Sequence, residues 1–304
     1  MNPPDARPQV RTIATADGAV LRVYVHGPAD APPIVLSHGW VCRADYWNPQ
    51  IRALAGVDGT GPYRVVTYDQ RGHGESTNGS RAALADVLAD DLAEVLAETL
   101  RPGERAVLGG HSMGGMSIMA WARRHPEQAG LVGAILLLNT GCGRLLAETT
   151  VLPFIPAGKV PHRIGAAILG ARLPLPPLWL LRPLAKMRIM PGGSPDAVDF
   201  TARMLLSCPP ATRGRWGRML AAMDLGGPAP IAGVPVSVLA GERDHLTPPV
   251  HAEGIAAEFG GDLRRFAVLP GVGHMGNLEA PDEVTAELLA LARLVPAAPS
   301  EIAG

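Results

Sequence analysis

Residues 109–116 read GGHSMGGM, a single serine within a cluster of glycines. The pattern G-x-S-x-G is typical of a sharp strand-to-helix turn that presents a nucleophilic serine. Such a turn needs small neighbours because the serine backbone is strained and the following helix lies close. Gly110 and Gly114 meet this need, so Ser112 is a candidate nucleophile if the rest of the chain supplies its partners.

The flanking residues place Ser112 between a strand and a helix. An apolar run at 105–108 precedes it, and residues 113–124 predict a helix that ends before Pro126. Backbone N–H groups at the start of that helix can stabilise negative charge that develops beside the serine.

Short apolar runs alternate with helical segments along the chain, which predicts an α/β fold with a mostly parallel sheet. Continuous rather than alternating apolar runs are typical of strands buried on both faces. The expected strands are 34–37, 63–68, 105–108, 131–138, 234–240 and 263–269. The run 20–25 alternates, so we expect it to be an antiparallel edge strand of a mixed sheet.

Residues 141–228 are rich in proline and interrupt this rhythm. We interpret them as an insertion of short helices, a cap or lid, between the core segments 1–140 and 229–304. Residues 141–225 carry 11 Lys and Arg against 4 Asp and Glu, in a chain of net charge −1. This basic segment is either a solvated surface or an entrance that favours anionic substrates or membrane surfaces.

Composition excludes several classes of protein. The chain has 304 residues, 47% of them hydrophobic and 18% charged, enough for a large core, and its net charge gives no reason to expect nucleic-acid binding. Three widely spaced cysteines suggest reduced thiols and a cytoplasmic protein. The first ten residues contain no apolar signal sequence, and arginines and prolines interrupt the most apolar stretch, 164–184, which argues against a membrane span.

Five motifs occur in a fixed order along the chain. They are SHGW at 37–40, YDQRGHGES at 68–76, GGHSMGG at 109–115, AGERDHLTP at 240–248 and PGVGHMGNLEAP at 270–281. Together they resemble the α/β-hydrolase fold serine hydrolases of the lipase and esterase type, over residues 20–140 and 230–294. The resemblance implies a mostly parallel, twisted sheet of about eight strands, flanked by helices, beneath a variable helical cap.

The resemblance also implies a triad of Ser112, Asp244 and His274. In this family the nucleophile comes first in the chain, then the acid, then the histidine, each on a loop after a strand. Asp244 follows an expected strand and is favoured over Glu242 because it is the shorter and more rigid carboxylate. The common alternative position for the acid, directly after the strand 131–138, offers no carboxylate.

Nine histidines compete for the role of base. Only His274 follows the last expected strand and so has the required order and position. His38, His73 and His111 accompany glycine turns, where we expect them to hold loops together.

An oxyanion hole needs two backbone N–H donors. Met113, directly after the nucleophile, is expected to supply one and Trp40 the other, with Gly39 allowing close approach. The Trp40 indole would then lie in the acyl pocket.

Two glycine-rich motifs are weak indicators of nucleotide binding. GVGHMG at 271–276 fits a dinucleotide-binding pattern, but it follows the last expected strand. DQRGHGES at 69–76 is better explained as a turn in which Asp69 and Arg71 organise buried charge. We therefore expect no cofactor and no metal.

Hydrolysis of a carboxylic ester is the expected function. The apolar cap suggests medium or long acyl groups, with Phe154, Leu169, Trp179 and Leu180 as candidate lining residues, and its basic residues could meet anionic lipid head groups or an anionic acyl carrier. Simple packing of these apolar residues on the core remains an alternative.

Other functions on the same scaffold stay open. They are a cofactor-free haloperoxidase or perhydrolase, a thioesterase, a lactonase, a C–C bond hydrolase and a non-catalytic ligand receptor. Epoxide and haloalkane hydrolases are disfavoured because they carry an aspartate where this chain has Ser112.

Overall fold

A computed structural model describes residues 4, 6–149 and 161–296. Its centre is an eight-stranded sheet in the order β1-β2-β4-β3-β5-β6-β7-β8, in which β1, β2 and β4 pair antiparallel and all further pairs are parallel. The strands are β1 (Gln9–Ala14), β2 (Val20–His26), β3 (Pro33–Ser37), β4 (Arg64–Asp69), β5 (Ala106–His111), β6 (Val132–Leu138), β7 (Val236–Gly241) and β8 (Leu263–Leu269). The predicted α/β fold with a mostly parallel sheet is confirmed.

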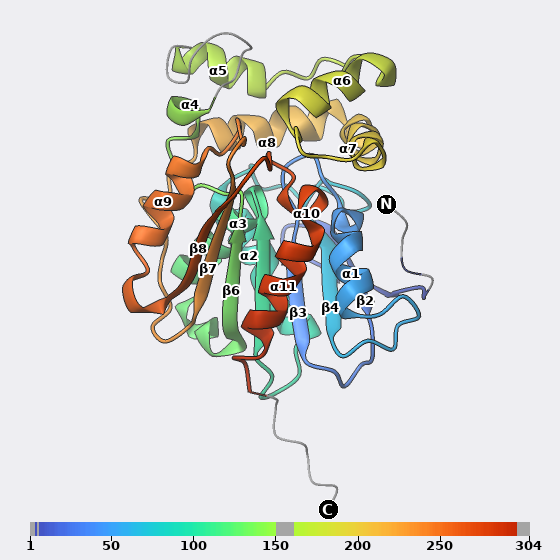
Figure 1. Ribbon diagram of the computed structural model, residues 1–304, viewed down its shortest axis with the longest axis vertical. Coiled ribbons are helices and arrows are strands. Elements are labelled where there is room, and N and C mark those ends of the chain that lie inside the picture. The colour runs from blue at the N-terminus through green and yellow to red at the C-terminus, as the bar shows by residue number, and fades with distance from the viewer. Residues whose placement is uncertain (1–3, 5, 150–160, 297–304) are drawn as a thin grey trace, which may run out of the picture.

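Helices cover both faces of this sheet (Figure 1). The helices of the core are α1 (Asn48–Leu54), α2 (Ala85–Thr99), α3 (Met113–Arg124), α9 (Pro249–Ala257), α10 (Gly276–Glu279) and α11 (Pro281–Ala292), with short 3-10 turns at Ala44–Trp47, Pro126–Leu131 and Gly260–Asp262. One apolar cluster joins α2, α3 and α9 to one face, and a second joins α1 and α11 to the other. The central strands β3 to β7 are therefore buried along their whole length, as their continuous apolar runs predicted.

The prediction that the run at 20–25 forms the edge of the sheet is wrong. β2 is antiparallel as expected, but it lies between β4 and β1. β1 itself forms the edge and is exposed at five of its six positions, so it lacks the apolar pattern by which a strand is recognised.

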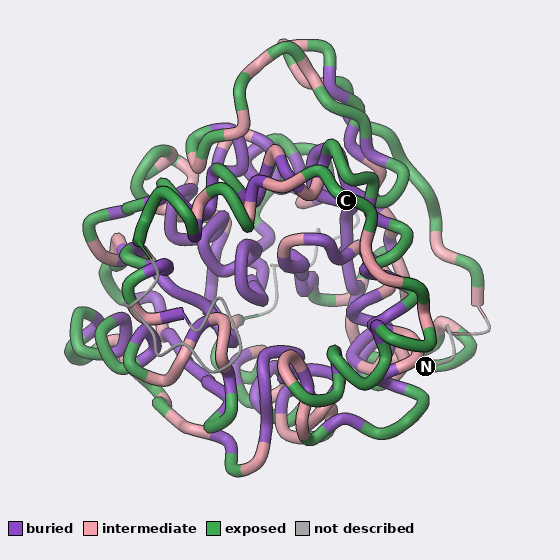
Figure 2. Tube along the Cα trace, turned by 90° about the horizontal axis from the view of Figure 1, so that it is seen from above, coloured by how far each residue is buried: buried purple, intermediate pink, exposed green. Residues whose placement is uncertain are grey.

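Five helices of the insertion lie over the carboxyl ends of the parallel strands (Figure 1). They are α4 (Leu145–Glu148), α5 (His162–Leu169), α6 (Leu178–Arg188), α7 (Pro195–Ser207) and α8 (Pro210–Ala222). Seen from above, the buried backbone lies inside a rim of mostly exposed helices and loops (Figure 2). None of the helices within the described ranges has both the length and the apolar character that crossing a bilayer requires.

This arrangement brings the segments that follow three strands to the same end of the sheet. The carboxyl ends of β5, β7 and β8 face the insertion, and only β6 separates β5 from β7. In open parallel sheets, ligands bind outside the carboxyl ends of the strands.

Candidate active site

Ser112 occupies the tight turn between β5 and α3. Its backbone has φ 52° and ψ −119°, a combination that L residues rarely adopt. Two hydrogen bonds stabilise the turn: the Ser112 N–H donates to the Leu138 carbonyl at 3.0 Å, and Thr140 Oγ1 donates to the Ser112 carbonyl at 2.7 Å. The strained turn thus depends on β6 and on the residues that directly follow it.

Glycines let the turn and the loop after β3 approach each other closely. A Cβ at Gly114 would lie 2.1 Å from the Ser37 carbonyl oxygen, and one at Gly39 would lie 3.1 Å from Ser112 Cβ. A side chain at Gly114 would displace the Ser37 backbone, and one at Gly39 would also lie 2.8 Å from His111 Nδ1, so both positions favour glycine. The loop that carries the Trp40 N–H is thereby held against Ser112.

The two backbone donors expected of an oxyanion hole are available. Within the described residues, no acceptor is recorded for the N–H of Trp40 or of Met113. Met113 is the first residue of α3, so its N–H belongs to the helix terminus where anions are stabilised.

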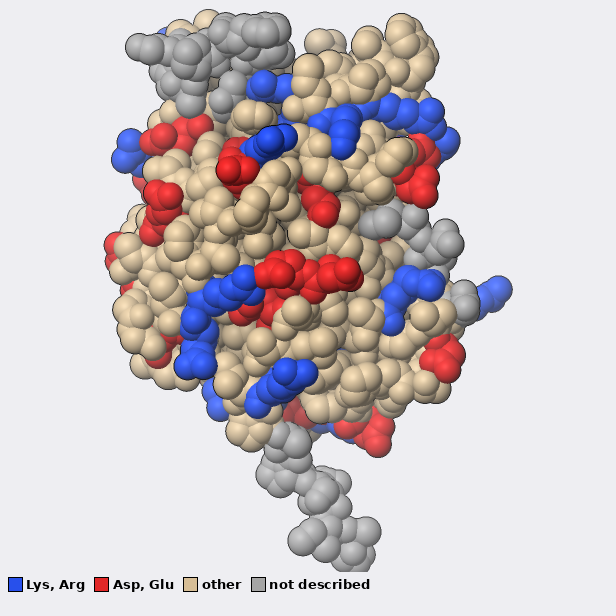
Figure 3. Space-filling view, viewed as in Figure 1, with Lys and Arg blue, Asp and Glu red and all other residues tan. Residues whose placement is uncertain are grey.

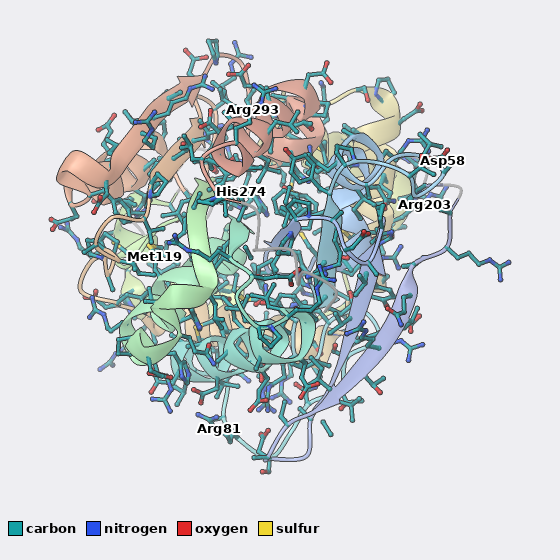
Figure 4. All side chains as sticks on the ribbon, turned by 90° about the horizontal axis from the view of Figure 1, so that it is seen from below. Asp58, Arg81, Met119, Arg203, His274 and Arg293 are labelled. Atoms are coloured by element: carbon teal, nitrogen blue, oxygen red, sulfur yellow. The ribbon has the colours of Figure 1, made fainter. Side chains whose placement is uncertain are left out.

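Asp244 and His274 form a buried pair. His274 Nδ1 lies 2.8 Å from Asp244 Oδ2, and the Asp244 side chain is inaccessible to solvent. Figure 4, viewed from below the molecule, shows His274 toward the middle of the projection, whereas Asp58 and Arg81 lie near its rim. The structure therefore brings together the acid and the histidine that sequence analysis selected.

Several donors keep the Asp244 carboxylate ionised. Leu246 N and Thr247 N donate to Oδ1 at 2.8 and 2.9 Å, and Thr247 Oγ1 lies 2.8 Å from Oδ2. Burial alone would raise the pKa of Asp244, but the His274 imidazole and these hydrogen bonds outweigh it, so that this pKa is lowered. An ionised Asp244 orients His274 through its Nδ1–H.

Asn139 is a site residue that sequence analysis missed. It follows β6 directly, in the left-handed backbone region with φ 45°, and its Nδ2 donates to Asp244 Oδ2 at 2.9 Å and to the Gly273 carbonyl at 3.0 Å. This is the alternative acid position, where only a carboxylate was sought. An amide at that position could have been recognised as a donor to an acid on the neighbouring strand.

His111 connects the serine turn to the histidine loop. Its Nε2 lies 2.8 Å from the His274 carbonyl oxygen, and the two rings have centroids 4.9 Å apart. Because a carbonyl only accepts, His111 carries its proton on Nε2. Burial, and next the neighbouring His274, lower the pKa of His111 well below its usual value, so the ring is neutral.

The Ser112 and His274 side chains are not hydrogen-bonded to each other. Within the described residues, no hydrogen bond joins Ser112 Oγ to His274. Catalytic hydrogen bonds often shorten only once substrate is bound, so this geometry is compatible with a proton transfer between the two side chains.

The insertion contacts the histidine loop. The His274 N–H donates to the Ile189 carbonyl at 2.6 Å. The Glu279 carboxylate accepts from Gly192 N and from Gly273 N, at 2.8 and 3.0 Å. The segment between α6 and α7 therefore helps to position His274.

Trp40 links the loop after β3 to α8. Its Nε1 donates to the Arg213 carbonyl at 3.0 Å, and a Cβ at Gly217 would lie 2.9 Å from its ring. The same Cβ would lie 2.0 Å from the Leu169 carbonyl oxygen. Of the candidate lining residues, Trp40 and the backbone of Leu169 thus both approach Gly217 on α8.

Trp179 and Leu180, two of the candidate lining residues, face outward rather than toward the core. α6 turns Leu181 and Ala185 inward, which directs the preceding two side chains outward, and Trp179 is 73% exposed. Phe154, the remaining candidate, lies outside the described residues.

The glycine-rich turn at 69–76 has the structural role expected of it. Arg71 is buried and pairs with Asp17 and Asp91, each at 2.6 Å. Asp69 accepts from Ala44 N at 2.7 Å and Glu75 N at 2.8 Å.

Among the described residues, no cluster of three or more His, Cys, Asp or Glu side chains could hold a metal ion.

Comparison with known proteins finds similar sequences and similar folds. The model of the alpha/beta hydrolase family matches residues 34–288. The chain is similar to the putative carbamate hydrolase RutD of Variovorax paradoxus, with 33% identity over 157 residues, or 45% of this chain and 56% of that protein. It is also similar to a non-heme chloroperoxidase of Streptomyces lividans, with 37% identity over 128 residues, or 42% of this chain and 44% of that protein. The chain thus spans about half the length of these curated relatives.

Among solved structures, an esterase from Exiguobacterium antarcticum has a similar fold. The TM-score is 0.76 at 19% identity, and the match covers 94% of this chain and all of that one. At this level of identity the match supports the fold alone.

Proposed function

Because this chain belongs to the alpha/beta hydrolase family, we propose that it is a serine hydrolase that cleaves carboxylic esters through an acyl-enzyme. The observation that carries the proposal is the strained Ser112 at the start of α3, on the same sheet edge as the buried pair of His274 and Asp244. The chemistry needs only these side chains and backbone N–H groups.

In the first half-reaction Ser112 Oγ attacks the ester carbonyl while His274 takes the serine proton. Asp244 stabilises the imidazolium that forms, because it is ionised and hydrogen-bonded to Nδ1. The N–H groups of Trp40 and Met113 stabilise the oxyanion. The carbon–oxygen bond to the alcohol then breaks, and His274 returns its proton to the leaving alcohol.

In the second half-reaction water attacks the acyl-enzyme. His274 takes a proton from the water, the hydroxide adds to the acyl carbon, and the proton returns to Ser112 Oγ as the acid leaves. Free enzyme is regenerated with no net gain or loss of protons on the triad.

We assign the acyl group to the apolar space beneath the insertion. Trp40 packs there against a cluster that contains Val41, Leu181 and Leu205, and Leu169 approaches the same helix, α8, at Gly217. These apolar contacts support substrates with medium or long acyl chains. The outward position of Trp179 and Leu180 confines the proposed contact to Trp40, Leu169 and their neighbours.

Perhydrolase activity is a second candidate, because the non-heme chloroperoxidase is among the similar sequences. In that reaction hydrogen peroxide replaces water as the acyl acceptor, and the acyl-enzyme releases a peracid. The same triad serves both reactions, so the acceptor distinguishes them.

The experiment is turnover of p-nitrophenyl esters from acetate to palmitate, with purified wild type, Ser112→Ala and the exposed-loop control Ser80→Ala. We expect Ser112→Ala to lower kcat by at least about ten-thousand-fold and Ser80→Ala to have no effect. Ester turnover that persists in Ser112→Ala would overturn the assignment. Adding peroxide with an acetate buffer tests the second candidate, which predicts Ser112-dependent peracid formation.

A further inference from the structure

The outward side of α5, α6 and the segment 170–177 between them exposes many large apolar side chains; we call it the outer cap surface. Seven of the fifteen exposed large hydrophobic residues of the described chain lie between residues 161 and 190. They are Ile164, Ile168, Leu173, Trp179, Leu180, Leu184 and Met187. Monomeric proteins seldom gather exposed apolar groups in this way without a partner for them.

The inner sides of the two helices are already used for packing. α5 buries Gly165 against Leu146 and packs on α8, while α6 buries Leu181 and Ala185 against α7. The exposed residues therefore lie on the faces left over after the insertion has folded. Trp179 and Leu173, 73% and 71% exposed, make little contact with the rest of the protein.

The part of the sequence that contains this surface is basic. The sequence from 149 to 195 contains six Lys and Arg and no Asp or Glu. Asp199 on α7 pairs with both Arg182 and Arg203, so it offsets part of this charge. Arg163 and Arg172 are exposed, and within the described residues no carboxylate pairs with either.

The shape of the region suits a flat partner. In Figure 1, α5 and α6 form the outermost layer at the end of the molecule above the sheet. Figure 3 shows a band of basic side chains close to this end, with most of the visible acidic groups farther down. A helix layer with apolar residues at its tip and basic residues around it is typical of proteins that bind at a lipid interface.

A symmetric pair of copies fits this surface less well. A two-fold contact through the outer cap surface would place the same patch opposite itself. The exposed Arg163 and Arg172, which pair with no carboxylate among the described residues, would then lie in a contact whose two sides are both basic. Such juxtaposition of like charges is unfavourable.

We propose that the outer cap surface docks the protein onto an anionic lipid surface. Trp179, Leu173 and Met187 enter the boundary between head groups and acyl chains, and Arg163 and Arg172 lie at the lipid phosphates. The proposal is independent of the catalytic assignment, because none of these residues belongs to the triad or to the expected oxyanion donors. Docking in this orientation turns the end of the molecule that holds the candidate active site toward the lipid.

Trp179 provides a direct readout. It is the most exposed of the five tryptophans, and Trp47, Trp121 and Trp216 are fully buried. Full-length protein is mixed with vesicles of phosphatidylcholine alone or with added phosphatidylglycerol, and both sedimentation and tryptophan emission are recorded. We expect vesicle binding and a blue shift of the emission only when phosphatidylglycerol is present. Binding should weaken in about 0.5 M salt, because the Debye length is then only a few ångströms.

Variants separate the apolar and the basic contributions. Trp179→Ala with Met187→Ser should lower the vesicle partition coefficient by about tenfold or more, and Arg163→Gln with Arg172→Gln should remove the preference for phosphatidylglycerol. Trp179→Phe should keep binding but lose the blue shift. The matched controls are Val250→Ser, an exposed apolar residue on α9, and Arg293→Gln, an exposed arginine just after α11.

Three results would overturn the proposal. They are equal binding to both vesicle types, equal loss of binding in the control variants, and sedimentation velocity showing a dimer that Trp179→Ala with Met187→Ser dissociates. The last result would assign the surface to a second copy of the chain. Turnover of a soluble ester without vesicles should be unchanged in all these variants, so failure of docking and failure of the proposed hydrolase activity remain distinguishable.

Discussion

Asn139 Nδ2 donates a hydrogen bond to Asp244 Oδ2 at 2.9 Å, although 105 residues separate the two in the chain. The Asn139 amide lies directly after β6. A carboxylate at this position would lie against the Asp244 carboxylate. Neutral donation lowers the pKa of Asp244, whereas a second negative charge would raise it.

Asn139→Asp is therefore expected to make activity more sensitive to acid. Two carboxylates this close share a proton, so their joint pKa should rise by about one unit or more. Protonation then removes the ionised partner of His274, and the acid limb of kcat/KM against pH should move upward. Asn139→Gly keeps the left-handed backbone without adding charge and is expected to lower kcat/KM with a much smaller shift of this limb. Superimposable acid limbs in wild type and Asn139→Asp would contradict the prediction.

Gly114→Ala should destabilise the fold severely. Its Cβ would lie 2.1 Å from the Ser37 carbonyl oxygen, a backbone atom that cannot move without distorting β3. We expect a loss of about 3 kcal/mol or more in the free energy of unfolding, measured by urea titration. Gly254→Ala is the matched control: it lies on α9 with nothing within 4 Å of the added Cβ, and it should stabilise the protein by about 1 kcal/mol. Equal effects of the two substitutions would show that close approach to Ser37 does not require glycine.

His38 should make the stability of the loop after β3 depend on pH. Its Nδ1 lies 2.7 Å from the Gly39 carbonyl and its Nε2 accepts from Gln70 N at 2.9 Å, so protonation would break the second bond. Burial lowers the pKa of His38 from 6.5 to about 4. Between these values the unfolded chain binds the proton and the folded one does not, so stability falls as the pH falls, by up to about 1.4 kcal/mol per pH unit.

The test of His38 is chemical denaturation at several pH values between about 7 and 4. His38→Gln can make both hydrogen bonds without titrating. The stability difference between wild type and variant should shrink, or reverse in favour of the variant, as the pH falls. If the stabilities of wild type and His38→Gln changed in parallel across this pH interval, the prediction that only the unfolded chain protonates His38 would be wrong.

Trp40→Phe tests whether the Trp40 indole holds the loop after β3 in place or determines which acyl chain lengths are cleaved. The substitution removes the donor to the Arg213 carbonyl, so an anchor predicts a loss of about 1 kcal/mol in stability and a similar fall in kcat/KM for every ester chain length. A residue that mainly lines the acyl site predicts a loss that grows with chain length. We expect the uniform fall, because phenylalanine keeps an apolar ring in the proposed acyl site but loses the hydrogen bond that Trp40 Nε1 makes to α8.

Much of the candidate site could be predicted from the sequence, because it depends on local patterns. Continuous apolar runs predicted the buried parallel strands, and glycines around Ser112 predicted the turn in which its φ is 52°. Asp244 and His274 were selected by chain order and by their places after strands. Their contact at 2.8 Å follows because parallel strands bring their carboxyl ends to one edge.

The remaining features were decided by tertiary structure. β1 is nearly all exposed, so no burial pattern distinguishes it from a loop until it pairs with β2. The inward side of α6 is chosen by packing on α7, and this choice directs Trp179 to solvent. Trp40 reaches Arg213 across 173 residues, and Asn139 reaches Asp244 across 105. The sequence alone determined the order of the parallel strands and the types of residue at the ends of three of them, because backbone geometry and local burial encode them. Only the folded chain decided which distant side chains support Asp244, anchor the loop after β3 and face the surroundings, because those contacts arise when separate elements pack together.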